Sequence, residues 1–227
     1  KSMLDMCAAL ESKVLLVCSS TSRHASEEPD RLAEDLAKLA MLALPLGIKI
    51  AYEGLSWGRT VNEFTTAWDL VCRADMPNLG LGLDSFHVFA AGTALDALDD
   101  IDGNRIYLVQ LSDFMWHDTP TFEERITTAR TFRVFPGEGV HTPALIELTR
   151  ALERIGFSGD YSFEVFNDDY QQIPLATVCA RARRSAGASS TPPRAASSTS
   201  TSTGRTSWSS ARTADCRPRS PRATSCS

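Results

Sequence analysis

Short apolar runs alternate with segments of helical spacing over residues 1–184 of this 227-residue chain. The first run, Val14-Leu15-Leu16-Val17-Cys18, is followed over 29–44 by leucines and alanines three and four positions apart, as on one face of a helix. Runs without polar alternation are typical of parallel strands buried on both faces. Six such runs occur, at 14–18, 48–52, 79–83, 106–111, 131–135 and 161–166. Alternating strands and helices predict parallel strands joined by helical crossovers.

The helices expected between these strands lie at 2–10, 29–44, 61–73, 94–98, 142–155 and 175–184. A doubly wound sheet and a (β/α)8 TIM barrel both fit six βα units. A complete barrel takes ~250 residues, so the chain would be truncated to about six of eight units. Because the pattern begins inside a helix rather than at a strand, we expect part of the barrel to precede Lys1.

The composition changes sharply after Arg184. Residues 185–227 contain no Leu, Ile, Val or Phe, and six arginines face a single acid, Asp215. Such a segment cannot offset its ordering entropy by burial, so we predict a disordered, low-complexity tail beside a catalytic domain at 1–184. The use of Arg without Lys, beside Ser, Ala and Pro, also fits an out-of-frame reading of GC-rich DNA.

Charge and cysteine usage exclude several classes of protein. A net charge of −5 offers no basic surface for nucleic acid. No apolar run reaches ~18 residues, so no membrane span is expected. The six cysteines are scattered without a C-x-x-C pair, which argues against a disulfide framework or zinc knuckle. Reduced thiols indicate a cytoplasmic protein.

Polar residues end four of the predicted strands. Glu53, Asp84, Gln110 and Glu164 follow apolar runs and are separated by 31, 26 and 54 positions. One βα unit of a barrel averages about 31 residues, so the third gap holds two units, with the strand at 131–135 between them. All four side chains are then expected at the same height of the C-terminal mouth, where barrel active sites lie. Three carboxylates and one amide oxygen suit a hard divalent ion such as Mg²⁺ or Mn²⁺.

The residues around these positions carry a resemblance to a known family. The segments concerned are Tyr52-Glu53-Gly54-Leu55-Ser56-Trp57-Gly58-Arg59, Gly82-Leu83-Asp84-Ser85-Phe86-His87, Val109-Gln110-Leu111-Ser112-Asp113, Arg133-Val134-Phe135-Pro136-Gly137-Glu138-Gly139 and Phe163-Glu164-Val165-Phe166-Asn167-Asp168. Over residues 1–184 the chain resembles the xylose-isomerase-like TIM-barrel superfamily of sugar isomerases and epimerases. Within it, the chain is most similar to the bacterial 3-dehydroshikimate dehydratases.

The resemblance implies a function. In that family the four matching positions bind one divalent metal (Mg²⁺, Mn²⁺ or Co²⁺), and 3-dehydroshikimate becomes protocatechuate and water in quinate and shikimate breakdown. Several relatives carry a histidine two residues after the first ligand, where this chain has Leu55. Proton transfer is therefore expected to rest on His87, in the loop after Asp84, as general base and as the acid for the departing hydroxyl.

Further residues near the motifs have two readings each. Arg59 and Arg133 are candidates to clamp the substrate carboxylate, or form surface ion pairs. Trp57 either lines the pocket or packs, and Glu138 either supports the site or ends a turn. Ser112 and Asp113 order the metal's surroundings or, as we favour, cap the next helix. The remaining histidines are expected at the surface: His24, His117 and His141.

Three other functions stay open. An isomerase or epimerase acting on a sugar phosphate, hydroxypyruvate or another polyhydroxy ketone would use the same metal, although Leu55 disfavours two-sided proton transfer. A phosphodiesterase would need several metals and more histidine ligands than four histidines supply. An inactive, truncated fragment is the third, because an open barrel exposes sheet edges. The expected partner is a small-molecule substrate, 3-dehydroshikimate or a related polyhydroxy ketone, and homo-oligomerisation is left open.

Overall fold

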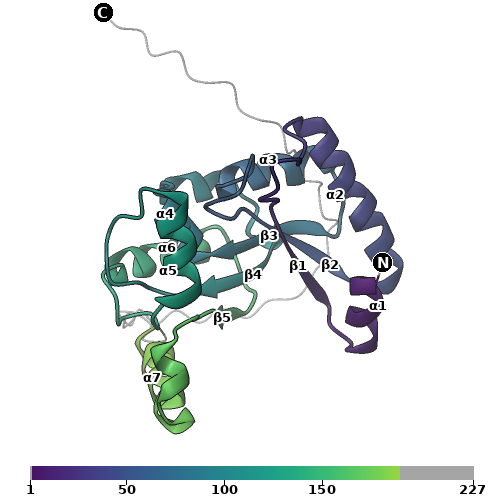
Figure 1. Ribbon diagram of the computed structural model, residues 1–227. Helices are drawn as coiled ribbons and strands as arrows, with labels where there is room; N and C mark the ends of the chain where they lie inside the picture. The colour runs from purple at the N-terminus through teal and green to yellow at the C-terminus, as the bar shows by residue number, and fades with distance from the viewer. Residues whose placement is uncertain (1, 190–227) are drawn as a thin grey trace, which may run out of the picture. The chain divides into compact units, whose positions relative to one another are not determined.

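The computed structural model describes residues 2–189. Five strands form one parallel sheet in the order β1-β2-β3-β4-β5 (Figure 1). Their bounds are β1 Val14–Cys18, β2 Lys49–Glu53, β3 Leu79–Asp84, β4 Ile106–Leu111 and β5 Tyr161–Phe163. Each strand pairs with the next strand along the chain, which is the neighbour order of a singly wound barrel rather than a doubly wound sheet.

Helices connect the strands and cover the outer face of the sheet (Figure 1). Seven α-helices are described, namely α1 Ser2–Ala9, α2 Pro29–Ala43, α3 Phe64–Ala74, α4 Ser85–Ala91, α5 Phe122–Thr131, α6 Thr142–Arg154 and α7 Leu175–Ser189. Four 3-10 turns lie at Leu44–Leu46, Leu95–Asp100, Gly103–Arg105 and Asp169–Gln172. The main core lies between helices and sheet, where Leu36 and Leu70 of the helices join Ile50 and Leu81 of the strands.

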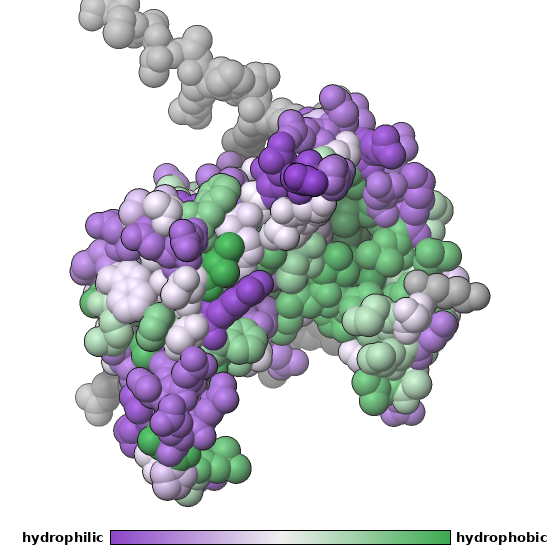
Figure 2. Space-filling model, in the orientation of Figure 1, coloured by the Kyte–Doolittle hydropathy of each residue, from purple (hydrophilic) through white to green (hydrophobic). Residues whose placement is uncertain are grey.

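The sheet is an open half-barrel. Within the described residues β1 and β5 each pair with a single neighbour, and Val14–Val17 of β1 are half-buried. Figure 2 shows hydrophobic surface in the hollow beside β1 and β2. The predicted partial barrel is confirmed over residues 2–189, and β1 forms an exposed edge of its sheet.

The strand predicted at 131–135 is wrong, so the sheet has five strands rather than six. The segment makes two isolated antiparallel bridges, Asp113↔Val134 and Phe132↔Asn167. Pro136 follows at once, and its missing backbone N–H prevents a longer ladder. β4 therefore pairs directly with β5, Val109 lying beside Tyr161.

Two helices were missed from the sequence. α4 follows β3 with no loop, because Asp84 both ends the strand and caps the helix, its Oδ1 accepting from the backbone N–H of Phe86 at 2.8 Å. α5 begins with a capping box between Thr121 and Glu124. α7 runs to Ser189, past the expected start of the tail at Ser185. The remainder of the predicted tail, from residue 190, lies outside the described residues.

A register shift in the β3–β4 pair decides which residues lie side by side at the ends of the two strands. Leu81 lies opposite Ile106, but Gly82 lies opposite Leu108, so Tyr107 is an extra residue in β4. After the shift Asp84 lies beside Gln110.

Within residues 2–189 no helix is long and apolar enough to cross a membrane.

Candidate metal centre

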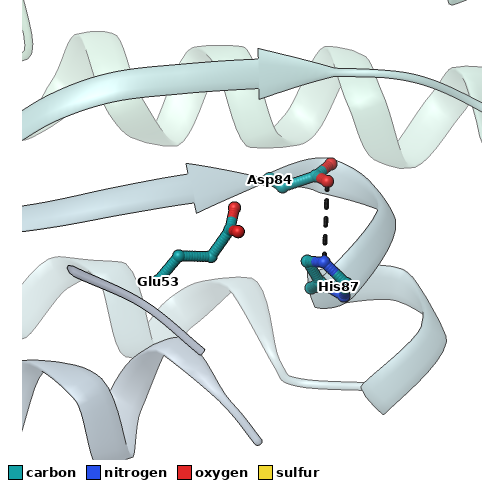
Figure 3. Close-up of side chains that lie close together, drawn as sticks. All are labelled: Glu53, Asp84 and His87. Atoms are coloured by element: carbon teal, nitrogen blue, oxygen red, sulfur yellow. Dashed lines mark ion pairs between the residues drawn. The ribbon is translucent and has the colours of Figure 1, made fainter. Parts of the chain in front are cut away.

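Three buried side chains meet at the C-terminal ends of β2 and β3 (Figure 3). Glu53 ends β2, Asp84 ends β3 and His87 lies in the first turn of α4. Each offers one ligand atom, and these atoms lie within 4.8 Å of one another. The three side chains are at most 5% exposed. Two carboxylates and an imidazole at this spacing can hold a metal ion.

The predicted ligands lie on one face of the sheet. Asp84 and Gln110 are paired positions, whereas Glu53 ends a strand whose Tyr52 lies opposite Leu81. Gln110 lies opposite Ser162, so Glu164 comes two residues further along. Even-numbered offsets keep side chains on the same face of a sheet, and offsets between neighbouring strands accompany the tilt of strands in a barrel.

Two buried oxygens test whether this cluster suits a cation. Among the described residues, Glu53 Oε1 and Gln110 Oε1 have no hydrogen-bond partner, and both side chains are buried. A buried acceptor without a donor costs about 1–3 kcal/mol. Unpaired acceptors beside Asp84 fit a cation that accepts oxygen ligands.

Glu53 and Glu164 hold their protons more tightly than usual. Burial, and secondly the charge of Asp84, raise the pKa of Glu53 to about 8. The pKa of Glu164 is also raised, again by burial first and by Asp84 second. Carboxylates without a cation repel one another in this way. A bound divalent ion would favour their ionised forms.

Arg133 lies between two predicted ligands rather than in a strand. It follows the end of α5 by two residues, is 3% exposed, and donates from Nη1 to Asp84 Oδ2 at 2.6 Å and to Glu164 Oε2 at 3.0 Å. Glu164 follows the last residue of β5, and its side chain is partly exposed. Glu164 is thus held by Arg133, outside the tight group of Glu53, Asp84 and His87.

His87 belongs to α4, not to a loop as predicted. Its Nδ1 accepts from the backbone N–H of Ser56 at 3.1 Å, and its Nε2 lies 3.7 Å from Asp84 Oδ2. Burial, with Arg133 as the second cause, lowers the pKa of His87 to about 3, so the ring is neutral. The Ser56 contact places the single ring proton on Nε2, facing Asp84.

The other predicted site residues divide between the cluster and the surface. Trp57 is half-buried and meets the His87 ring edge-on at 4.9 Å between centroids. Arg59 pairs with Glu27 at 2.9 Å, both side chains being exposed. Glu138 accepts from Arg181 at 2.6 Å, so it anchors α7 to the turn that follows Phe135.

Two further predictions are wrong, the helix cap at Ser112 and Asp113 and the surface position of His141. Ser112 and Asp113 cap no helix: the Ser112 N–H donates to Ser85 Oγ at 2.9 Å, and Asp113 accepts from the backbone N–H groups of Gly139 and His141. His141 is not at the surface but 8% exposed, with Nδ1 3.1 Å from Asp113 Oδ1. His24 and His117 are exposed, as predicted.

Cys18 was missed. It ends β1 directly beside Glu53, and its Sγ donates to Glu53 Oε2 at 3.3 Å. Burial, followed by the Glu53 charge, raises the pKa of Cys18 to about 12, so it is a thiol. The pattern that predicted Glu53, Asp84 and Gln110, a polar residue at the end of an apolar strand, is also present at Cys18.

Comparison with known proteins gives a consistent family. The chain matches the xylose isomerase-like TIM barrel family over residues 1–188. It is 39% identical to 3-dehydroshikimate dehydratase of Pseudomonas aeruginosa over 75% of this chain and 26% of that protein. It is 31% identical to inosose isomerase of Bacillus subtilis over 81% of this chain and 65% of that protein. The chain therefore spans about a quarter of the bacterial dehydratases it matches, 26% and 28% of two of them.

Comparison with solved structures gives the same fold. A xylose isomerase-like TIM barrel/4-hydroxyphenylpyruvate dioxygenase fusion protein superposes with a TM-score of 0.75 at 33% identity, over 81% of this chain and 28% of that one. The IOLI protein, solved with a bound zinc atom, superposes with a TM-score of 0.70 at 28% identity, over 83% of this chain and 66% of that one.

Proposed function

Because this chain belongs to the xylose isomerase-like TIM barrel family, we propose that it forms the metal-binding part of a dehydratase that converts 3-dehydroshikimate to protocatechuate and water. The observation that carries the proposal is the pair of buried, unpaired oxygens of Glu53 and Gln110 beside Asp84. The similarity to the Pseudomonas aeruginosa dehydratase supports the choice of substrate.

Four side chains would hold the ion: Glu53, Asp84, Gln110 and Glu164. When bound there, a divalent ion would draw electron density from a ketone oxygen and make the neighbouring C–H bond more acidic. An oxygen-rich set of this kind favours Mg²⁺, Mn²⁺ or Co²⁺, and the zinc in the IOLI structure adds a fourth ion to test.

Proton transfer is assigned to His87. With Nδ1 accepting from Ser56 N–H, the ring proton lies on Nε2 in the resting site. The Ser56 hydroxyl also lies 3.1 Å from Nδ1 and can accept a proton from it instead, with loss of the Ser56 N–H hydrogen bond. In that second tautomer Nε2 is free to take a proton from carbon. The same proton can then pass from Nε2 to the departing hydroxyl, which leaves the ring neutral again.

Arg59 is assigned to the substrate carboxylate. Arg133 is already held by two carboxylates, whereas Arg59 is held by one exposed ion pair with Glu27. Exposed pairs contribute about 0–1 kcal/mol, so a substrate carboxylate can replace Glu27 at little cost. A guanidinium can bind a carboxylate through two parallel hydrogen bonds.

An isomerase acting on a polyhydroxy ketone is the second candidate. It is favoured by the inosose isomerase relatives, of which the chain covers a larger share, up to 65%. Both reactions move a proton next to a ketone, but the dehydratase also expels hydroxide. Inosose carries no carboxylate, so this candidate leaves Arg59 without a role.

The test uses the purified chain with Mn²⁺ and either 3-dehydroshikimate or inosose. Appearance of catechol absorbance from the first substrate supports the dehydratase, and Glu53→Gln should abolish it. Conversion of inosose alone would favour the isomerase. A second arm adds ~70 residues, about two barrel units, from a dehydratase relative at the N-terminus. If activity appears in that arm alone, the chain by itself is an inactive fragment, and no activity in either arm rejects both functions.

A further inference from the structure

Arg133 is the most deeply buried positive charge at the mouth of the half-barrel. Its side chain is 3% exposed and its Nη1 contacts two carboxylates, Asp84 at 2.6 Å and Glu164 at 3.0 Å. The contact with Asp84 uses Oδ2, because Oδ1 already accepts from the backbone of α4. Oδ2 is also the oxygen that faces His87 Nε2 at 3.7 Å. Arg133 therefore contacts the same Asp84 oxygen that faces His87.

The guanidinium is fixed in this position by contacts outside the acidic cluster. Nε donates to the carbonyl of Ala129, near the end of α5, at 2.9 Å. The rings of Phe86 and Phe166 lie 4.6 and 5.7 Å from Cζ. The backbone N–H of Arg133 donates to Phe166 O at 3.0 Å. A cation held from so many sides costs little further ordering when it binds the carboxylates.

The charge balance explains why a cation is needed. Glu53 and Asp84 are buried carboxylates with ligand atoms within 4.8 Å of each other, and Glu164 lies beside them, partly exposed. Buried charges need a partner of opposite charge, and one guanidinium compensates part of this charge when no other cation is there. A divalent ion would compensate more of it, and it would draw on the carboxylates of Asp84 and Glu164 that Arg133 contacts.

We propose that Arg133 is a built-in counter-cation that competes with the divalent metal for Asp84 and Glu164, and so keeps the metal exchangeable. The inference rests on the metal site of the proposed function. It gives Arg133 a role different from that of a substrate clamp: Arg133 is a positioning residue that stabilises the metal-free site and weakens metal binding.

The experiment measures Mn²⁺ binding by calorimetry at one fixed pH for wild type, Arg133→Gln and Arg133→Lys. Arg154→Gln is the matched control, because Arg154 also pairs with an acid, Asp99, at 2.7 Å but at an exposed position. We expect Arg133→Gln to bind Mn²⁺ about tenfold more tightly, a change of about 1.4 kcal/mol. The melting temperature of metal-free Arg133→Gln should be lower than that of metal-free wild type. The rise in melting temperature on adding Mn²⁺ should be larger for Arg133→Gln than for wild type.

Arg133→Lys should fall between wild type and Arg133→Gln, since an ammonium keeps the charge without the planar fork. It also keeps the test decisive if Arg133→Gln fails to fold. Equal or weaker Mn²⁺ binding by both folded variants would overturn the proposal, because Arg133 would then support the ligands rather than compete with the ion. Absence of Mn²⁺ binding in every variant would overturn it too. Dehydratase activity of wild type, measured separately, tests the proposed function alone.

Discussion

The thiol of Cys18 donates a hydrogen bond to the carboxylate of Glu53 at 3.3 Å, across the β1–β2 pair. This contact lowers the pKa of Glu53, against the larger upward effects of burial and of Asp84. Cys18 of β1 thus influences the pH at which the neighbouring Glu53 becomes charged. Cys18 acts through Glu53 and needs no contact with substrate.

Cys18→Ala should weaken metal binding near neutral pH. Loss of the donor raises the Glu53 pKa further above about 8, so a larger fraction of the sites must lose a proton before binding. We expect Mn²⁺ affinity at pH 7 to fall about 3–10-fold, within the range of about 0.5–1.5 kcal/mol for one ordinary hydrogen bond, since a thiol is a weak donor. Cys18→Ser keeps a donor and is the matched control. Equal losses in both variants would show that packing, not the hydrogen bond, matters.

Metal affinity should rise with pH. Glu53 is protonated below about pH 8 in the metal-free protein, and metal binding must release that proton. Affinity should then increase about tenfold per pH unit between 6 and 8 and level off above. Calorimetry in two buffers of different ionisation enthalpy counts the protons released. A flat profile would contradict protonation of Glu53.

The stability of the metal-free protein should change in the opposite direction. The folded pKa of Glu53, about 8, lies above its ordinary value of 4.5. Its contribution to stability is therefore fully present below about pH 4.5 and is lost as pH rises through about 8. Urea unfolding in the presence of a chelator should show wild type losing stability over this window and Glu53→Gln losing less. Identical slopes for the two proteins would count against the raised pKa.

Arg59→Gln should raise KM for 3-dehydroshikimate about 10–100-fold with little change in kcat, if Arg59 binds the carboxylate in ground state and transition state alike. Glu27→Gln is the control, because it removes the exposed partner of Arg59. That variant should leave KM unchanged or lower it. A fall in kcat alone for Arg59→Gln would move Arg59 from binding to another role.

Asn78→Ala should destabilise the fold. The buried Asn78 amide donates from Nδ2 to the carbonyls of Ala40 at 2.9 Å and Ile48 at 3.0 Å, and so joins α2 to the segment entering β2. Its loss leaves buried carbonyls without this donor and should cost about 2–3 kcal/mol in urea unfolding. Asn104→Ala, which removes an exposed amide, should change stability by about 0.5 kcal/mol or less.

The strand ends could be found from the sequence because their signal is local. Ile50 to Glu53 and Leu81 to Asp84 are short apolar segments that end on an acid, and the spacing between them follows one βα unit. α5 also had a local signal that was overlooked, the capping box from Thr121 to Glu124. Thr131 to Phe135 has the β-branched and aromatic composition of a strand, but Pro136 ends it.

The contacts that define the cluster are non-local and leave no such signal. Arg133 is 49 positions from Asp84, and Cys18 is 35 from Glu53. Burial of His141 depends on Asp113, 28 positions away. Spacing in a sequence indicates which residues share an edge of a sheet, whereas pairing of side chains depends on how the loops at that edge are packed.

The extra residue in β4 has a consequence for how this site can change in evolution. If the bulge were straightened with Tyr107 in the ladder, the register of Leu81 and Ile106 would continue, and Asp84 would lie beside Val109 rather than beside Gln110. Both ligands would remain in the sequence, yet the hydrocarbon side chain of Val109 would take the place of the amide oxygen. Lineages could therefore gain or lose this ligand set through a change of strand register that leaves both ligand residues in the sequence, and a comparison by aligned residue identity alone would not reveal it.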